Sequence, residues 1–181
     1  MKVSSFSIKR KIVIIAIFLV IILGFVCFYV THNFFEYRRI VENCLDDSFL
    51  EASLVLAVCK AESNFDSLAV SDKGAKGVMQ LTDATFGFVS DKFSLSYSKE
   101  DIFDKYKNVN AGCRYLEYLF DKFHDEYTVL CAYNAGEGNV KKWLTDPRYS
   151  SDGVTLYFVP FEETADYVEK VLFFKRFYDR L

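Results

Sequence analysis

The apolar and polar positions divide the chain into one uninterrupted apolar run, residues 12–30, and a series of amphipathic segments behind it. The run carries no formal charge. As a helix with a rise of about 1.5 Å per residue, it spans roughly the hydrocarbon core of a bilayer. A buried helix of a soluble domain is the alternative, but a cluster of basic residues directly before the run favours a membrane segment.

The residues at the end of this run decide what kind of membrane segment it is. A cleaved signal peptide needs small residues before the cleavage site, whereas residues 25–30 are almost all bulky. A lipoprotein needs a small residue before its modified cysteine, whereas Cys27 follows Val26. An uncleaved anchor with its N-terminus in the cytoplasm therefore fits best. We expect a basic cytoplasmic tail at 1–11, a transmembrane anchor at 12–30, a juxtamembrane stalk at 31–45 and one exported domain at 46–181.

Apolar residues recur with helical spacing through the exported part. Leu54, Val58 and Ala61 mark its first helix, which is expected to end at 63–64. Ser48, with Glu51 three residues later, predicts the N-cap and a capping box. Because no segment alternates with a period of two, the predicted class is mainly α. Further helices are expected at 82–90, 108–123, 127–133, 140–144 and 161–178, with an irregular loop at 67–77 and short turns at 91–107.

Composition and charge narrow the function. The first eleven residues carry a formal charge of +4, which leaves −7 for the rest of the chain, with 18 basic against 25 acidic residues. An acidic domain without a basic cluster is a poor match for nucleic-acid binding. We expect no metal and no cofactor, because the exported cysteines fit no metal-binding spacing. Their pairing stays open, and burial as small apolar residues is the simplest interpretation for Cys44, Cys59, Cys113 and Cys131.

Candidate chemistry is concentrated in a few short segments. Glu62 stands at the end of the first exported helix, just before a loop, among apolar neighbours. Partial burial disfavours the carboxylate and raises its pKa, as a general acid for glycosidic bonds requires. A surface glutamate at a helix end is the ordinary alternative, and the companion segments argue against it. These are Ser71 with 74–81, then Ala132-Tyr133-Asn134-Ala135-Gly136, and Pro160-Phe161-Glu162-Glu163-Thr164.

In this order and spacing, the segments resemble the family 1 lytic transglycosylases, whose catalytic domain has a lysozyme-like fold. The resemblance runs from about residue 49 to about residue 178 and includes the Asn-rich element at 108–116. It implies that 46–181 is the catalytic domain, that Glu62 is its catalytic residue and that peptidoglycan strands are its substrate. Glu62 would protonate the oxygen between N-acetylmuramic acid and N-acetylglucosamine. It would then take the proton of the muramyl C6 hydroxyl, which closes a 1,6-anhydro ring.

The resemblance also implies positions that contact substrate. Ser71 matches a serine that bonds the N-acetyl group, Tyr133 lies near the catalytic carboxyl, and Glu163 contacts a sugar or a peptide-stem amine. A loop cap for Ser71, a core position for Met79 and a helix end for Asn134 are the ordinary alternatives. Ala165 replaces an arginine that is common in the family. The complete set is Ser71, Gly77, Met79, Gln80, Tyr133, Asn134 and Glu163.

Two other functions keep the same fold. A hydrolytic, goose-lysozyme-like muramidase needs a second carboxylate to hold water, and Asp66 or Asp72 would have to provide it. A wall-binding module of an envelope-spanning assembly needs no catalysis, but the presence of Glu62 beside its companion residues argues against it. The expected location is the bacterial inner membrane, with the domain on the extracytoplasmic side.

Overall fold

The computed structural model describes the backbone of residues 3–181 and the side chains of residues 10–24 and 32–181. The chain forms two compact units, Met1–Tyr37 and Arg38–Leu181. Helix α1 (Val3–Cys44) runs through the first unit, and its last turns belong to the second.

In the first unit, the apolar side chains from Ile12 to Leu23 are exposed. Within the described part of the chain, no helix combines the length and apolarity that crossing a membrane requires. The predicted anchor at 12–30 includes residues 25–30, and therefore Cys27, whose side chains lie outside the described residues. Most of the predicted basic tail at 1–11 lies outside them too.

The second unit is built from helices joined by loops. After α1 come α2 (Ala52–Ser63), α3 (Asp83–Lys92), a short 3₁₀ helix η1 (Lys99–Phe103), α4 (Lys105–Phe123), α5 (Glu126–Ala135), α6 (Glu137–Leu144) and α7 (Glu162–Tyr178). Extended pairing in the described residues is limited to the isolated bridges Val70–Lys76 and Lys76–Leu81. The prediction of a mainly α class is therefore confirmed, and so is the irregular loop at 67–77.

The predicted N-cap of the first exported helix is wrong. Helix α2 begins at Ala52 with Glu51 as its N-cap residue, and no side chain caps it. The Ser48 hydroxyl instead accepts a hydrogen bond from the Leu50 amide at 3.2 Å, within the preceding turn. A serine that bonds an amide two residues away competes with capping, which a sequence pattern alone does not reveal.

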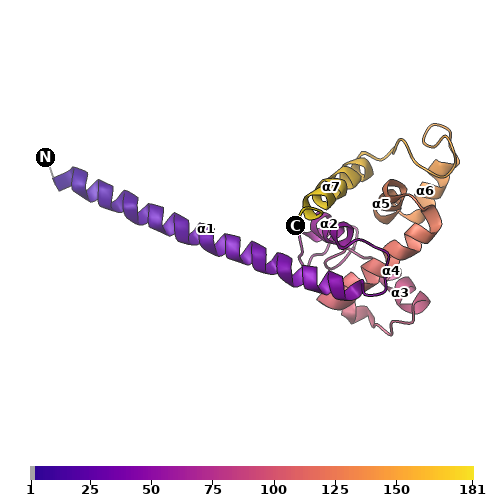
Figure 1. Ribbon diagram of the computed structural model, residues 1–181, viewed down its shortest axis with the longest axis horizontal. Coiled ribbons are helices and arrows are strands. Elements are labelled where there is room, and N and C mark those ends of the chain that lie inside the picture. Colours follow the sequence, from indigo (N-terminus) through magenta and orange to yellow (C-terminus); the bar gives the residue numbers. More distant parts are fainter. Residues whose placement is uncertain (1–2) are drawn as a thin grey trace. The chain divides into compact units, whose positions relative to one another are not determined.

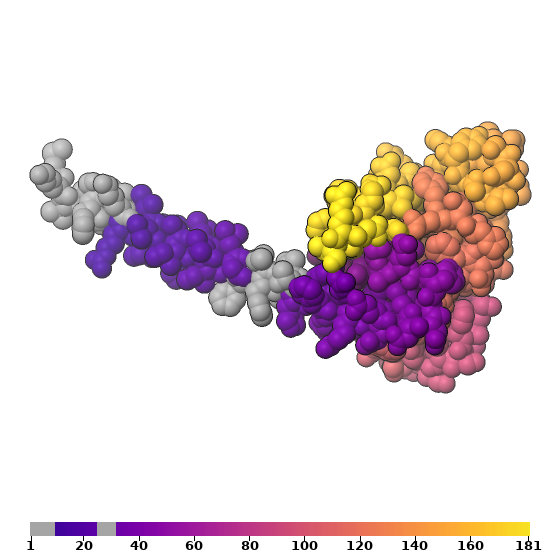
Figure 2. All heavy atoms as spheres, viewed as in Figure 1, coloured from indigo at the N-terminus to yellow at the C-terminus, as the bar shows by residue number. Residues whose placement is uncertain are grey.

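Helix α2 is the centre of the packing. Seven successive or near-successive positions of its short length are buried, so it is apolar on nearly every side, as befits a core helix. It lies along α7 (Figures 1 and 2), whose Val168 and Val171 are buried. Helix α5 packs against α4, α6 and α7. The cysteines Cys44, Cys59, Cys113 and Cys131 are buried and free.

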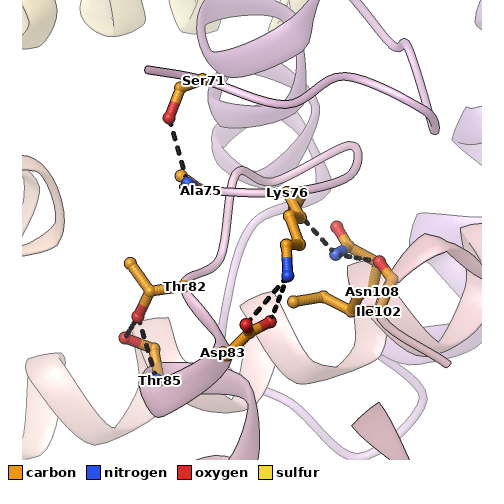
Figure 3. Close-up of polar contacts among 8 residues, drawn as sticks. All are labelled: Ser71, Ala75, Lys76, Thr82, Asp83, Thr85, Ile102 and Asn108. Carbon is orange, nitrogen blue, oxygen red and sulfur yellow. Dashed lines mark hydrogen bonds and ion pairs between the residues drawn. The ribbon is translucent and has the colours of Figure 1, made fainter. Parts of the chain in front are cut away.

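The side chain of Asn108 joins the distant loop at 76–79 to the end of η1 and the start of α4. From the first turn of α4, its Oδ1 accepts from the Met79 amide at 2.8 Å. Its Nδ2 donates to the carbonyl of Ile102 at 2.8 Å and to that of Lys76 at 3.2 Å (Figure 3). Gly77 lies directly against this amide at φ +75°, and a Cβ there would overlap it. Asn108 therefore fixes the loop that follows α2 onto α4.

Replacing Asn108 with alanine should destabilise the domain by about 3 kcal/mol. The change leaves the Met79 amide and the Ile102 carbonyl without this partner, each at a cost of about 1–3 kcal/mol, whereas the Lys76 carbonyl keeps the Leu81 amide at 3.0 Å. Urea unfolding of the full chain in mild detergent measures this loss. Asn139→Ala is the matched control, because Asn139 makes one local hydrogen bond to the Ala135 carbonyl. Similar losses for the two variants would contradict the joining role of Asn108.

Candidate active site

Glu62 lies in the last turn of α2, where the helix stops. The next residues turn the chain sharply, because Asn64 and Phe65 adopt left-handed backbone conformations with φ of 55° and 65°. The carboxyl group thus stands at the boundary between the apolar core and a loop. Burial raises the pKa of Glu62 from 4.5 to about 7. At neutral pH this group is partly protonated and can donate a proton.

Two residues of α7 counteract that burial. The Tyr167 hydroxyl lies close enough to hydrogen-bond the carboxylate and lower the pKa of Glu62, although its geometry gives no regular bond within the described residues. Lys170, one turn along α7, lowers that pKa through its positive charge. Its ammonium group donates to the Ala61 carbonyl at 2.6 Å. These contacts align α7 with the end of α2.

Tyr133 brings the end of α5 to the same place. Its hydroxyl donates to the Met79 carbonyl at 2.8 Å. Burial, and then the negative charge of Glu62, raise the pKa of Tyr133 well above its usual range. The Met79 side chain is fully buried and lies so close to Gly112 that a Cβ on that glycine would overlap it. Met79 therefore supports the site from the core, through its backbone, and does not line it.

The loop after α2 uses its polar side chains to hold its own shape. Ser71 accepts from the Ala75 amide through its hydroxyl at 3.0 Å (Figure 3). Gln80 donates to the Gly77 carbonyl at 2.9 Å and to the Ala69 carbonyl at 3.2 Å. The left-handed angle at Gly77 suits a residue without Cβ. The bond of Ser71 is thus the loop cap that was its ordinary alternative, and the bonds of Gln80 also hold the loop.

The first turn of α7 is tied to both flanks of the site. The Thr164 hydroxyl donates to Asn134 Oδ1 at 2.8 Å, which fixes α7 to the end of α5. The Lys73 ammonium bonds both carboxylate oxygens of Glu163 at 2.7 and 2.8 Å. Both partners are largely exposed, so this ion pair adds little stability, but it connects the loop to α7.

Comparison with known proteins identifies the family of this domain. A family model described as "Transglycosylase SLT domain" matches residues 43–153. The chain belongs to this family. The soluble lytic murein transglycosylase of Escherichia coli K12 is 33% identical over 130 residues, which cover 70% of this chain and 20% of that protein. The membrane-bound lytic murein transglycosylase C of Pectobacterium atrosepticum is 30% identical over 132 residues, 66% of this chain and 36% of the relative.

Solved structures of SLT proteins match the fold as well. The soluble lytic transglycosylase of 70 kDa from Escherichia coli has a TM-score of 0.69 at 27% identity, and covers 78% of this chain. An inactive mutant of Slt from Pseudomonas aeruginosa has a TM-score of 0.66 at 30% identity, and covers 80% of this chain. This chain spans about a quarter of each of these structures, 24% and 23%. The predicted mainly α, lysozyme-like SLT fold is confirmed.

Among the described residues of this SLT domain, no carboxylate acts on the pKa of Glu62. Asp66 instead accepts from the Leu68 amide at 2.9 Å and is exposed. Asp72 is exposed on the following loop. Both candidates for a second catalytic carboxylate are therefore exposed, whereas Glu62 is largely buried.

Some residues of the site were not identified from the sequence. Lys170 lies on the same face of α7 as Tyr167, three residues on, and this spacing was the available signal. Lys73 lies inside the motif beginning at Ser71, but its partner is ninety residues away. Nothing local marks such a pairing.

Replacing Glu62 with glutamine should stabilise the domain, and more so as the pH rises. The folded pKa, about 7, exceeds the ordinary value of 4.5, so folding takes up a proton between these values. The charge penalty is absent below pH 4.5, grows up to pH 7 and then stays near 3 kcal/mol. Urea unfolding of both proteins at pH 4.5 and 8 measures it. Glu162→Gln, an exposed change on α7, is the control. A Glu62→Gln effect that does not depend on pH would contradict the buried acid.

Proposed function

We propose that this chain cleaves peptidoglycan as a lytic transglycosylase, with Glu62 as its single acid and base. The observation that carries this proposal is the Glu62 carboxyl with a pKa near 7, at the end of a core helix and beside Tyr167. A general acid works best when its pKa lies near the working pH. The family and its relatives support the same reaction for this domain.

The reaction uses the two protonation states of Glu62 in sequence. The protonated carboxyl gives its proton to the oxygen that links N-acetylmuramic acid to N-acetylglucosamine, and the C1–O bond breaks. The resulting carboxylate takes the proton of the muramyl C6 hydroxyl, whose oxygen bonds to C1. The product is a 1,6-anhydromuramyl end, and no water is consumed. Lys170 and Tyr167 stabilise the intermediate carboxylate, since both lower the pKa of Glu62.

A mechanism with one carboxylate fits the surroundings of Glu62 better than hydrolysis does. Hydrolysis with inversion needs a second carboxylate about 6.5–9.5 Å away to activate water. Asp66 is engaged with the Leu68 amide, and Asp66 and Asp72 are both exposed on the loop after α2. We therefore rank hydrolysis second.

The remaining predicted residues form the surroundings of the bond that is cleaved. We propose that Tyr133 and Ser71 line the substrate site near Glu62, and that Gly77 and Gln80 hold the loop that carries Ser71. Glu163 presents its carboxylate to the peptide stem. Met79 and Asn134 act indirectly, through the Tyr133 and Thr164 hydroxyls respectively.

We also propose that the domain is held at the bacterial inner membrane. The supporting observations are the uncharged run at 12–30, the basic tail at 1–11 and the similarity to membrane-bound relatives. The juxtamembrane segment at 31–45 then leads to the catalytic domain at 46–181 on the extracytoplasmic side. The last turns of α1, from Arg38, belong to the same compact unit as that domain. Cutting close to the membrane, in general wall turnover or for an envelope-spanning assembly, follows from this arrangement.

Digestion of purified peptidoglycan tests the proposed reaction. The full chain in mild detergent should release muropeptides with 1,6-anhydromuramyl ends, identified by mass spectrometry. Glu62→Gln should slow their release by about 10²–10⁴-fold, because the acid and the base are both lost. Asp66→Asn and Asp72→Asn are matched controls that should leave the products unchanged.

Other products would assign another function. Reducing muramyl ends that disappear in Asp66→Asn or Asp72→Asn would establish hydrolysis. Binding to peptidoglycan without release by either the parent or Glu62→Gln would establish a wall-binding module. Release by Glu62→Gln at the parental rate would remove Glu62 from the reaction.

A further inference from the structure

Aromatic rings form a continuous strip that begins beside Glu62. Tyr133 contacts Tyr115 of α4, with ring centroids 5.5 Å apart. Tyr115 stacks on Tyr118, one turn along α4, at 6.1 Å. Tyr118 meets Phe88 of α3 edge-to-face at 5.1 Å. The strip thus leads from the candidate active site to the surface, where the Phe88 side chain is 42% exposed.

Two lysines gather over the outer end of this strip. The ammonium groups of Lys92 and Lys122 lie 5.3 and 5.1 Å from the centre of the Tyr118 ring. Both lysines are exposed, so their ammonium groups can reach a ligand. The chain beyond residue 11 carries a formal charge of −7. Two cations over one ring are therefore a local exception in an acidic part of the chain.

The Tyr118 ring is held in place from its hydroxyl end. That hydroxyl donates to Glu137 Oε2 at 2.7 Å. Lys141 pairs with the other oxygen of the same carboxylate, so the acid beside the strip is already neutralised. A fixed ring loses little freedom on binding, which favours a role in recognition.

We propose that Phe88, Tyr118, Lys92 and Lys122 form a platform that binds the peptidoglycan strand away from the bond that is cleaved. The aliphatic faces of sugar rings pack on Tyr118 and Phe88, as apolar surface does on aromatic rings. The ammonium groups of Lys92 and Lys122 pair with carboxylates of the peptide stems. The proposal of this platform rests on the proposed function, since the strip begins beside Glu62. It assigns to each residue the part of the substrate that it recognises.

A platform remote from the reacting atoms acts on binding and not on the chemical step. Its loss should raise KM and leave kcat unchanged, because substrate and transition state lose the same contacts. Tyr118→Ala should raise KM for intact peptidoglycan about tenfold and change kcat less than twofold. Tyr118→Phe keeps the ring and should raise KM much less than Tyr118→Ala does, because it loses only the hydroxyl bond to Glu137. The Lys92→Gln and Lys122→Gln pair should raise KM about fivefold.

The test compares two substrates with the full chain in mild detergent. Initial rates are measured on soluble peptidoglycan fragments and on the same glycan after an amidase has removed the peptide stems. On stripped glycan the lysine pair should behave as the parent, whereas Tyr118→Ala should still raise KM. Phe173→Ala, exposed on α7, and the pair Lys99→Gln and Lys142→Gln are the matched controls. Thermal unfolding checks that each variant is folded.

The outcomes separate the platform from the proposed function. If the parent releases no muropeptide from either substrate, the proposed function fails first. If the parent cleaves both and Tyr118→Ala keeps the parental KM, the platform is wrong while the reaction stands. A KM that rises equally for the platform lysines and for Lys99 and Lys142 would mean a general charge effect, and would overturn the assignment of Lys92 and Lys122.

Discussion

The site depends on one constraint, which is that an ionisable carboxyl group is held at the end of a helix buried on nearly every side. Moving a carboxylate out of water is unfavourable unless it is paired or protonated. Here the result is intermediate, since burial raises the pKa of Glu62 while Tyr167 and Lys170 lower it. A group balanced in this way can give a proton and take it back near neutral pH.

That balance requires α7 to lie along α2, and the rest of the domain serves this arrangement. Lys170 donates to the Ala61 carbonyl, and the Thr164–Asn134 hydrogen bond fixes the start of α7 to α5. On the other side, Asn108 holds the backbone from Lys76 to Met79 against α4. Much of the site is therefore positioned through backbone atoms. These atoms are the same whatever side chain the residue carries.

Most of the helices were predictable from sequence because their apolar residues recur with helical spacing. The loop at 67–77 was predictable from its polar and glycine residues. The start of α2 was not, because the Ser48 hydroxyl bonds the Leu50 amide in the preceding turn. The positions of Ser71, Gln80 and Tyr133 near Glu62 were implied by the resemblance, but the partners of their side chains were not.

The structure shows which partners the polar side chains of the site meet. Tyr167 is buried with its hydroxyl toward Glu62, and Tyr133 donates to the Met79 carbonyl. Ser71 and Gln80 are at the predicted place, but their side chains bond the loop itself. Lys73 and Lys170 escaped prediction because their partners are distant in the chain, and periodicity carries no information on such contacts.

The most direct test is to titrate the Glu62 carboxyl itself. Carbon-13 NMR of the full chain in mild detergent, labelled at the glutamate side-chain carboxyl carbons, follows each group with pH, and the signal missing from Glu62→Gln identifies Glu62. The account predicts a midpoint near 7, above the ordinary value of 4.5. A midpoint near 4.5 would mean a solvated carboxylate, and would contradict a single residue acting as both acid and base.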